Sequence, residues 1–306
     1  MAWLALSAVC ILWGITYLGI RLALDAFSPF YLLATRFLLS GAILLVGAKL
    51  LGAKIPRGRD LWLTALFGII MIGMGTGLLV VVEQWMPTGL AALFISTQPF
   101  WMVMVDWLLP HGRRPRSKTL QGLFVGLAGV AILVGPAVLR EGWHGGTLIG
   151  FLLLQMGCFG FVVGALLQTR LHTDAHPVVI GAVQQFATGL FFLFWAIPLE
   201  PLPHNFGFWP LGGMLYLILL GSIVGYSAFS YAMHRLPPAI VSIYTFVNPI
   251  VAVFLGWLIF REHFGRREVA AMTLIFVGVA IVRSSTVTPT PASAPALLEK
   301  TVGVSN

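Results

Sequence analysis

The chain has 306 residues, of which 58% are hydrophobic and only 9% are charged. Because a soluble domain carries about 25% charged residues, this composition excludes a soluble globular protein and indicates an integral membrane protein. The formal net charge is +8, but the basic residues stand in short segments between apolar runs, where cations usually flank membrane spans. We therefore expect the lipid bilayer as a partner of this chain and no nucleic acid.

Ten apolar runs follow one another, each near the length of about 20 residues that a helix needs to cross a membrane. They predict an all-α integral membrane protein with ten transmembrane helices, followed by a disordered tail at residues 285–306 that is rich in Pro, Ser, Thr and Ala. The predicted spans are residues 2–24, 29–51, 61–82, 86–107, 120–138, 146–168, 177–198, 209–233, 236–257 and 267–282.

The fourth and ninth runs are related by an internal repeat. Each is opened by a proline and interrupted by a second proline twelve residues later, and an amide residue, Gln98 or Asn248, precedes the inner proline. The matching positions, at a constant offset of 150 residues, are Pro87 and Pro237, Pro99 and Pro249, and Trp107 and Trp257.

The repeat extends beyond these two runs and predicts two copies of one unit, at residues 1–138 and 146–284. Each copy contains five spans, and an odd number of spans makes the two copies insert with opposite orientation, as in many secondary transporters. With a cytoplasmic N-terminus, twelve of the 18 Lys and Arg residues fall on the cytoplasmic side, five outside, and Arg36 within a span. This excess predicts that both termini are cytoplasmic.

The inner prolines, Pro99 and Pro249, are predicted to be helix kinks or hinges. Each removes one backbone hydrogen bond and frees a carbonyl one turn earlier, at Ile95 and Thr245. Paired interruptions in the two halves of a transporter point to its binding site, so we expect these two helices to line a central cavity.

The substrate-binding candidates are polar and aromatic side chains near the middle of the predicted spans. Two alternatives remain open: the amides and hydroxyls beside the prolines repair their own kinked backbones, and the aromatic–glycine pairs Trp13-Gly14 and Phe159-Gly160 serve helix packing. The candidates are Trp13, Phe94, Ser96, Thr97, Gln98, Trp101, Phe159, Tyr226, Tyr244 and Asn248.

Arg36 is the deepest charge in the predicted spans. Three interpretations are open: the guanidinium pairs with Glu83 near the outer end of the third span, it extends to the membrane interface, or it contacts a substrate carboxylate. No carboxylate lies at the predicted midplane, so a relay of several acids is not visible. The energy source is therefore left open between a facilitator driven by the substrate gradient and proton coupling through an unexpected group.

No metal-ligating or catalytic set of residues stands within the predicted spans. There is no zinc-binding HExxH helix and no pair of aspartates at mid-depth, so we expect no enzyme activity, no metal and no cofactor. A cavity rich in aromatic rings and amides but poor in charge favours a neutral or zwitterionic, partly apolar small molecule as the substrate.

Two segments resemble a known family. ATRFLLSGAILL at residues 34–45 and NPIVAVFLGWLIFREHFGRREVAAMTLIFVGVAIV at residues 248–282 are similar to the EamA domain of the drug/metabolite transporter superfamily, and residues 261–265 look like its acidic turn. The resemblance covers nearly all of the chain except the tail. It implies two inverted five-helix repeats around a central cavity, in a protein that moves small metabolites out of the cell.

Within that family the chain looks most like bacterial amino-acid and metabolite exporters, including the aromatic amino-acid type. We therefore expect a monomeric secondary transporter of the bacterial inner membrane that exports amino acids by alternating access. The alternatives are an exporter of aromatic or cationic drugs or of other metabolites, and a channel-like facilitator.

Overall fold

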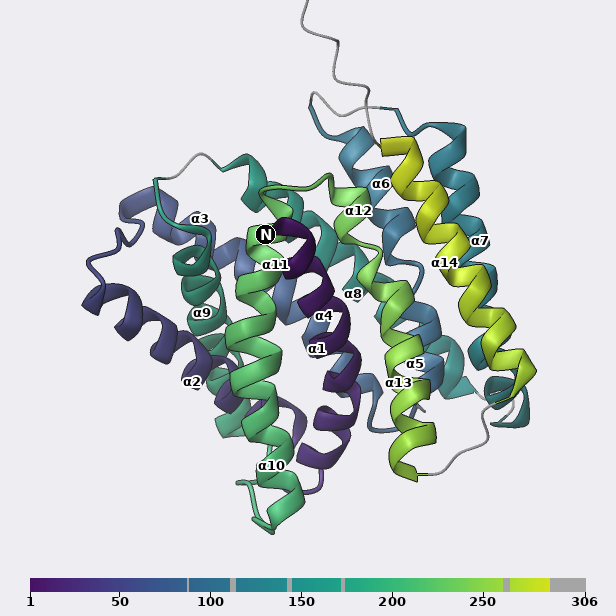
Figure 1. The fold of residues 1–306 in the computed structure, drawn as a ribbon. Helices are drawn as coiled ribbons and strands as arrows, with labels where there is room; N and C mark the ends of the chain where they lie inside the picture. Colours follow the sequence, from purple (N-terminus) through teal and green to yellow (C-terminus); the bar gives the residue numbers. More distant parts are fainter. Residues whose placement is uncertain (87, 111–113, 142–144, 172–173, 261–264, 287–306) are drawn as a thin grey trace, which may run out of the picture.

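The computed structural model describes residues 1–86, 88–110, 114–141, 145–171, 174–260 and 265–286, and these residues form helices and no strand (Figure 1). The elements are α1 (Ala2–Ala23), α2 (Pro29–Leu50), α3 (Gly58–Gly68), η1 (Ile69–Met74), α4 (Gly75–Val82), α5 (Thr88–Ile95), α6 (Gln98–Leu108), α7 (Ser117–Glu141), α8 (Gly145–Arg170), α9 (Pro177–Leu199), α10 (Phe208–Tyr216), η2 (Leu217–Val224), α11 (Gly225–Met233), α12 (Pro238–Val241), α13 (Tyr244–Phe260) and α14 (Arg266–Thr286).

Eight helical segments in this described part are long and apolar enough to cross a membrane, and Ser117–Leu133 and Pro238–Val251 are two shorter apolar stretches. This confirms the all-α membrane class expected from the composition. The predicted ends of the apolar runs agree with the helix ends to within about one helical turn. The tail prediction begins slightly too early, because α14 continues to Thr286; residues 287–306 and the turn at 261–264 lie outside the described residues.

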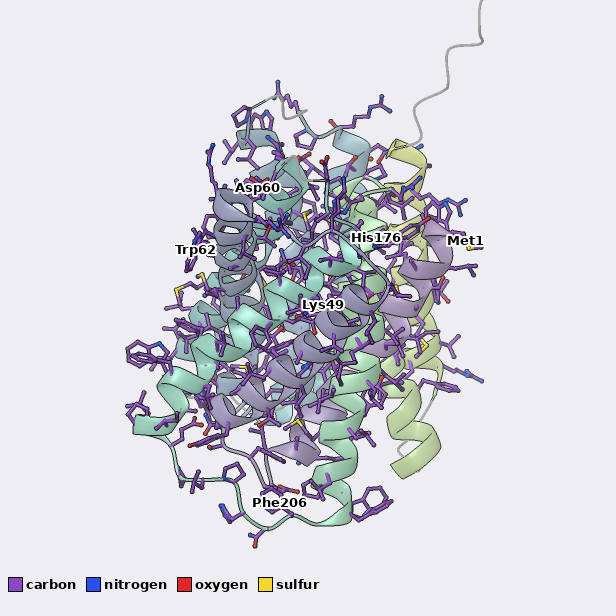
Figure 2. All side chains as sticks on the ribbon, turned by 90° about the vertical axis from the view of Figure 1, so that its left-hand side faces the viewer. Met1, Lys49, Asp60, Trp62, His176 and Phe206 are labelled. Atoms are coloured by element: carbon purple, nitrogen blue, oxygen red, sulfur yellow. The ribbon has the colours of Figure 1, made fainter. Side chains whose placement is uncertain are left out.

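The bundle has two ends, which we call the N-terminal face and the opposite face. Met1, Asp60 and His176 lie toward the N-terminal face, and Phe206 lies at the opposite face (Figure 2). At the opposite face the backbone N–H of His204 donates to the carbonyl of Ala26 at 3.0 Å. Hence the loops at residues 24–28 and 200–207 meet at one end of the bundle.

Two segments of π-helix interrupt the third and eighth predicted spans. η1 joins α3 to α4, and η2 joins α10 to α11, so each span is continuous but contains a wider turn near its middle. Glycines stand at or beside both segments, at Gly73 and Gly75 in one and at Gly221 and Gly225 in the other. π-Helical turns often occur at functional sites, and nothing in the hydrophobic pattern predicts them.

The fourth and ninth spans are interrupted, but only one of them breaks beside its inner proline. α5 ends at Ile95 and α6 begins at Gln98, so Pro99 occupies the first turn of α6, where its missing N–H is tolerated. In the second copy, α12 ends at Val241 and α13 begins at Tyr244, which leaves Pro249 inside α13. The interruption in the second copy thus lies about two turns before Pro249, and a kink or hinge at Pro249 itself stays a prediction.

Helices α2 and α9 cross in close contact through a reciprocal pair of glycines. A Cβ added to Gly41 would stand 2.5 Å from the backbone nitrogen of Phe186, and one added to Gly189 would stand 2.5 Å from the backbone nitrogen of Leu38. Small residues allow backbones to approach in this way in membranes. The contact holds the α2 side chains that face the centre of the bundle, among them Arg36, in a fixed position.

Helices α7 and α14 lie side by side at one flank of the bundle (Figure 1). A Cβ on Gly278 would stand 2.5 Å from the backbone nitrogen of Gly126, and one on Gly129 would stand 2.8 Å from that of Ile275. At the N-terminal face the Thr119 and Ser285 hydroxyls form a hydrogen bond of 2.7 Å. Within the described residues, neither α7 nor α14 contributes a lining residue to the central cavity described below.

Candidate substrate cavity

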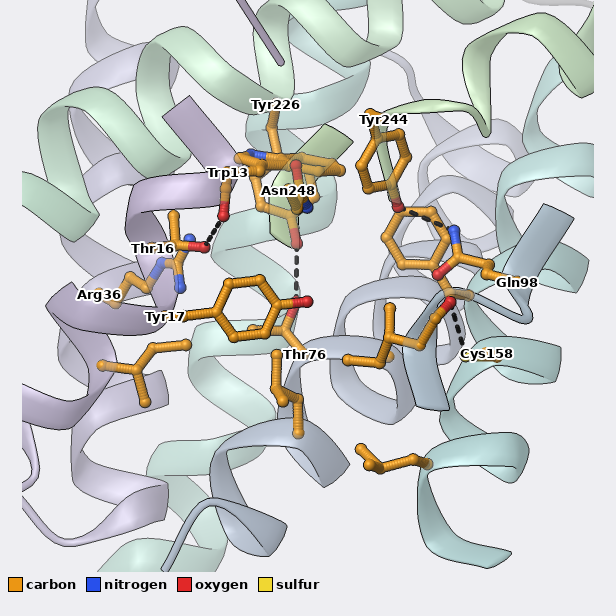
Figure 3. A pocket seen from close by; sticks show the side chains of 16 residues that line it. Trp13, Thr16, Tyr17, Arg36, Thr76, Gln98, Cys158, Tyr226, Tyr244 and Asn248 are labelled. Atoms are coloured by element: carbon orange, nitrogen blue, oxygen red, sulfur yellow. Dashed lines mark hydrogen bonds between the residues drawn. The ribbon is translucent and has the colours of Figure 1, made fainter. Parts of the chain in front are cut away.

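A cavity of about 70 Å³ lies in the middle of the bundle, where eight helices contribute lining residues (Figure 3). Its volume is enough for a few water molecules, and its walls combine aromatic rings, hydroxyls, amides and one guanidinium. The lining residues are Trp13, Thr16, Tyr17 and Ile20 of α1, Arg36 of α2, Gly75, Thr76 and Leu79 of α4, Ile95 of α5, Gln98 of α6, Leu154, Cys158 and Phe161 of α8, Tyr226 of α11, and Tyr244 and Asn248 of α13.

Trp13 is the centre of an aromatic cluster at this cavity. Its ring centroid lies 4.8 Å from that of Tyr226, 4.9 Å from that of Tyr244, 5.2 Å from that of Phe229 and 6.1 Å from that of Phe161. Its indole N–H donates to the carbonyl of Gly221 in η2 at 3.0 Å. Each such ring pair contributes about 0.5–1.5 kcal/mol beyond its buried area, so the cluster fixes the indole orientation.

Two glycines that follow the π-helical segments give these rings their space. A Cβ on Gly225 would stand 2.5 Å from the indole nitrogen of Trp13, and a Cβ on Gly75 would stand 2.7 Å from a ring carbon of Phe161. Contacts this close cannot be relieved by a flexible side-chain end, because indole and phenyl groups are rigid. Glycine at both positions is therefore a condition for the observed ring arrangement.

The Gly225→Ala substitution is expected to displace Trp13 and break its hydrogen bond to Gly221. Overpacking of this kind costs about 1–3 kcal/mol, and it also closes part of the cavity, so we expect lower thermal stability and at least a tenfold loss of transport. Gly212→Ala is the matched control, because a Cβ there meets nothing within 4 Å. Equal transport by the two variants would show that the Trp13 position is not needed.

Arg36 is buried, with 2% of its surface exposed, and its guanidinium is part of the cavity wall. Its Nε donates to the Ser222 hydroxyl at 2.7 Å, and its Cζ lies 4.9 Å from the centroid of the Phe37 ring. The Nη1 group is buried without a hydrogen-bond partner among the described residues. Of the three interpretations of Arg36, the structure contradicts the pairing with Glu83, whose carboxylate oxygens accept no hydrogen bond from the described residues, and the burial of Arg36 argues against its extension to the membrane interface.

Polar side chains link the broken helices around the cavity. The Gln98 amide donates to the Tyr244 hydroxyl at 2.8 Å, which connects α6 to α13, and the Thr76 and Tyr226 hydroxyls form a 2.9 Å hydrogen bond between α4 and α11 (Figure 3). With its amide oriented to satisfy its neighbours, the Asn248 nitrogen donates to the carbonyls of Tyr244 and Cys10. Both amides therefore belong to the cavity wall, and Asn248 also forms a side-chain hydrogen bond with Tyr17.

Five of the ten predicted binding residues line the cavity: Trp13, Gln98, Tyr226, Tyr244 and Asn248. Ser96 and Thr97 do not, because their hydroxyls are engaged elsewhere. The Ser96 hydroxyl lies 2.8 Å from the Ala92 carbonyl and 3.1 Å from the Thr245 carbonyl, and the Thr97 hydroxyl lies 2.7 Å from the Phe94 carbonyl and 2.8 Å from the Gln155 side-chain oxygen, so each proton is shared or used by one of two acceptors. The alternative interpretation, local repair of a kinked backbone, therefore holds for these two hydroxyls.

The remaining three predicted residues lie outside the cavity wall. Phe94 packs against Phe151 with their centroids 5.0 Å apart. Trp101 donates to the Gln155 side chain at 2.9 Å and stacks edge-on with Phe159, which is 42% exposed on the flank of the bundle. Phe161, two residues further along α8, faces the cavity instead of Phe159.

Both carbonyls that the inner prolines were expected to free are present and have partners. The Thr245 carbonyl accepts a hydrogen bond from Ser96 at 3.1 Å, and the Ile95 carbonyl lies 4.0 Å from the Cys158 sulfur. Because side chains already occupy them, these carbonyls are poorly placed to take a substrate ammonium. These side-chain contacts are what carbonyls freed by the prolines would need, and they connect neighbouring helices.

Several lining residues were missed by the sequence reasoning, although one signal was present. Thr16, Tyr17 and Ile20 share a helix face with Trp13 because they follow it at i+3, i+4 and i+7. Cys158 and Phe161 of α8 show no comparable pattern. No group of three His, Cys, Asp or Glu side chains within the described residues is placed to hold a metal ion.

The sequence that forms these apolar helices and their small polar and aromatic cavity was compared with known protein families. The sequence matches the EamA-like transporter family over residues 1–135 and 148–284. The chain belongs to the EamA-like transporter family. The resemblance seen at residues 34–45 and 248–282 is thereby confirmed, and the protein is a membrane transporter.

Relatives in this EamA-like family extend over most of the chain. The chain is 31% identical to the "Uncharacterized inner membrane transporter YedA" of Escherichia coli (strain K12), over 91% of this chain and 89% of the relative. It is 26% identical to "Protein PecM" of Dickeya dadantii, over 91% of each chain. It is also 26% identical to a "Probable terminal-alkyne amino-acid exporter" of Streptantibioticus cattleyicolor, over 83% of this chain and 84% of the relative.

A crystal structure of another protein has the same fold as this EamA-like chain. The two superpose with a TM-score of 0.79, and the alignment covers 92% of this chain and 95% of the other at 21% sequence identity. At this identity the likeness supports the fold alone. It agrees with the helical arrangement described above.

Proposed function

We propose that this protein exports amino acids or closely related small zwitterionic metabolites across the bacterial inner membrane by alternating access. The observation that carries the proposal is the buried Arg36 guanidinium in the cavity wall, whose Nη1 has no partner among the described residues. A buried polar group without a hydrogen bond costs about 1–3 kcal/mol. A substrate carboxylate would supply the missing acceptor and the counter-charge.

The rest of the cavity favours a molecule that is apolar apart from its charged ends. Trp13, Phe161, Tyr226 and Tyr244 offer flat surfaces, and the oxygen of the Gln98 amide, whose nitrogen is engaged with Tyr244, offers an acceptor for an ammonium. The buried Arg36 cation disfavours the alternative of a cationic drug, because like charges repel strongly in a medium of low dielectric constant.

The volume of the cavity limits what it holds in this conformation. About 70 Å³ suits the ammonium and carboxylate end of an amino acid, with little room for a large side chain. We infer that a bulky amino acid, including an aromatic one, enters only when Trp13 or Phe161 moves. This need for movement favours a carrier over a channel-like facilitator.

We further propose that ten membrane helices form two inverted repeats, at residues 1–138 and 146–284, with both termini in the cytoplasm. Reciprocal contacts support this arrangement: Gly225 abuts Trp13 as Gly75 abuts Phe161, and Gly41 abuts Phe186 as Gly189 abuts Leu38. In each pair of contacts, the glycine and the residue it touches are replaced in the second contact by residues 148 to 150 positions away in the other copy. A two-fold relation between the copies gives this pattern. The excess of basic residues at the N-terminal face and the inner-membrane relative YedA support the location.

The proposal is tested by counterflow in liposomes. Purified protein is reconstituted with one unlabelled amino acid inside, and entry of the same labelled amino acid is followed for each proteinogenic amino acid in turn. A carrier is expected to give a transient, saturable accumulation for at least one of them. Empty liposomes serve as the control, and the absence of counterflow with every amino acid would contradict the assigned substrate class. A flux that never saturates would instead indicate a channel.

A further inference from the structure

Glu83 lies directly beyond the cavity, toward the opposite face. It follows the last residue of α4 and keeps helical backbone angles, with φ −64° and ψ −10°. Thr76 and Leu79 of the same helix line the cavity, and Glu83 shares their face because it follows them by seven and four residues. The carboxyl group therefore continues the cavity-lining stripe of α4 by one turn.

Both carboxylate oxygens of Glu83 are buried, and neither accepts a hydrogen bond from the described residues. An ionised carboxylate without partners is strongly disfavoured in such surroundings. Burial raises the pKa of Glu83 to about 8, and the nearby Arg21 cation opposes this rise. Since the folded-state pKa is raised, the carboxyl group is protonated below about pH 8 and ionised above it.

The charged and titratable groups that interact with Glu83 come from α1. From α1, Arg21 and the cavity-lining Tyr17 interact electrostatically with it. The other helices packed against α4 contribute no charge that stabilises or destabilises the Glu83 carboxylate within the described residues; their titratable groups are Tyr31, Arg36 and Lys49 on α2 and Cys158 and Arg170 on α8.

We propose that Glu83 is the proton-binding site that couples inward proton movement to export. This inference rests on the proposed function, because it assumes a zwitterionic substrate. When the substrate carboxylate binds Arg36, the substrate ammonium enters the same small cavity and favours the ionised form of Glu83. Binding therefore releases the Glu83 proton, and the empty transporter takes a proton up again. One proton enters for each substrate that leaves.

The exchange balances without any other reactant. A proton from the water at the opposite face binds a Glu83 carboxylate oxygen and is released to the water at the N-terminal face, while one neutral zwitterion moves the other way. At zero membrane potential, one pH unit then supports about a tenfold concentration ratio of substrate. A facilitator that is not coupled to protons leaves the substrate concentration equal on the two sides of the membrane, which is a ratio of one.

The coupling is tested in liposomes that contain the amino acid giving the largest counterflow, at equal concentration on both sides. The interior is made one pH unit more acidic than the exterior, and the membrane potential is held at zero with potassium and valinomycin. Wild-type protein is expected to accumulate the labelled amino acid inside by up to about tenfold. The E83Q variant, a neutral mimic of the protonated acid, is expected to bind the substrate more weakly, and at a substrate concentration that restores counterflow it is expected to give a ratio of one.

Asp25→Asn is the matched control, because Asp25 is an exposed acid in the loop at the same face. It should accumulate substrate like the wild type. Accumulation by E83Q equal to that of the wild type would overturn the proposal, as would a wild-type ratio of one.

A second measurement does not depend on the substrate. In reconstituted membranes, the infrared band of a protonated carboxyl group is expected to disappear as the pH is raised through about 8, and to be missing from E83Q at every pH. If no amino acid gives counterflow but this band titrates, the substrate class is wrong and the proton-binding site stands. If Glu83 is ionised throughout, the proton-binding site is wrong whatever the substrate.

Discussion

The Arg36→Met substitution is expected to lower transport of an amino acid by about 100-fold, without loss of folded protein. Arg36 is buried, and its unpartnered Nη1 belongs to a guanidinium that lines the cavity. A charge-assisted contact between buried groups is worth about 2–5 kcal/mol when one partner is removed, and each 1.4 kcal/mol changes affinity tenfold. Methionine keeps an unbranched side chain in the same space but offers no donor.

Thermal stability is expected to be unchanged or higher in Arg36→Met. An isolated buried cation is costly, and its replacement by an apolar side chain is often neutral or stabilising. Arg36→Lys keeps the charge but not the planar set of donors, so we expect transport between that of the wild type and that of the methionine variant. Arg59→Gln, at an exposed arginine near the N-terminal face, should transport normally.

The comparison of an amino acid with its amide separates a role in substrate binding from a role in packing. Wild-type protein should prefer the free carboxylate, and Arg36→Met should lose that preference as well as the rate. If the methionine variant transports slowly but keeps the same preference, Arg36 does not bind the carboxylate. Its role would then be limited to the contact with Ser222.

The class and helix boundaries were predictable from the sequence because they depend on the spacing of apolar runs and prolines. Pro29 and Pro177 begin α2 and α9 as expected from proline at a helix start. The π-helical segments η1 and η2 were not predictable, because one extra residue in a turn leaves no trace in an entirely apolar run. The break before Tyr244 was also missed, since Ser242 and Ile243 carry no strong breaking signal.

The depth of the site was predictable, but the direction of each side chain was not. The proline pair placed Gln98 and Asn248 in the middle of the bundle, and both line the cavity. In a helix that is apolar on all sides, however, the sequence does not indicate which face is turned inward. For this reason the aromatic–glycine pair indicated Phe159 although Phe161 lines the cavity, and Ser96 and Thr97 were predicted to bind substrate although backbone carbonyls accept from them.

The Trp13→Ala substitution is expected to have the largest effect on stability among the cavity residues. Trp13 contacts rings from α8, α11 and α13 and donates a hydrogen bond to η2. Its removal leaves an unfilled space between these helices, and a buried tryptophan truncated to alanine typically costs about 3–5 kcal/mol. We expect the thermal midpoint of the purified protein to fall by roughly 10 °C, and counterflow to fall with it.

Two further variants show which property of Trp13 matters. Trp13→Phe keeps an aromatic ring in the cluster but loses the donor to Gly221, so it should recover most of the stability and lose about 1 kcal/mol. Trp62→Ala removes an indole that is 76% exposed on the outside of the bundle (Figure 2). This variant should change neither the thermal midpoint nor counterflow. If Trp13→Ala retained both the wild-type thermal midpoint and wild-type counterflow, the aromatic cluster would not hold the helices around the cavity. Because Trp13 lies between the helices of both halves of the chain, a change confined to transport would indicate that its indole moves during the transport cycle.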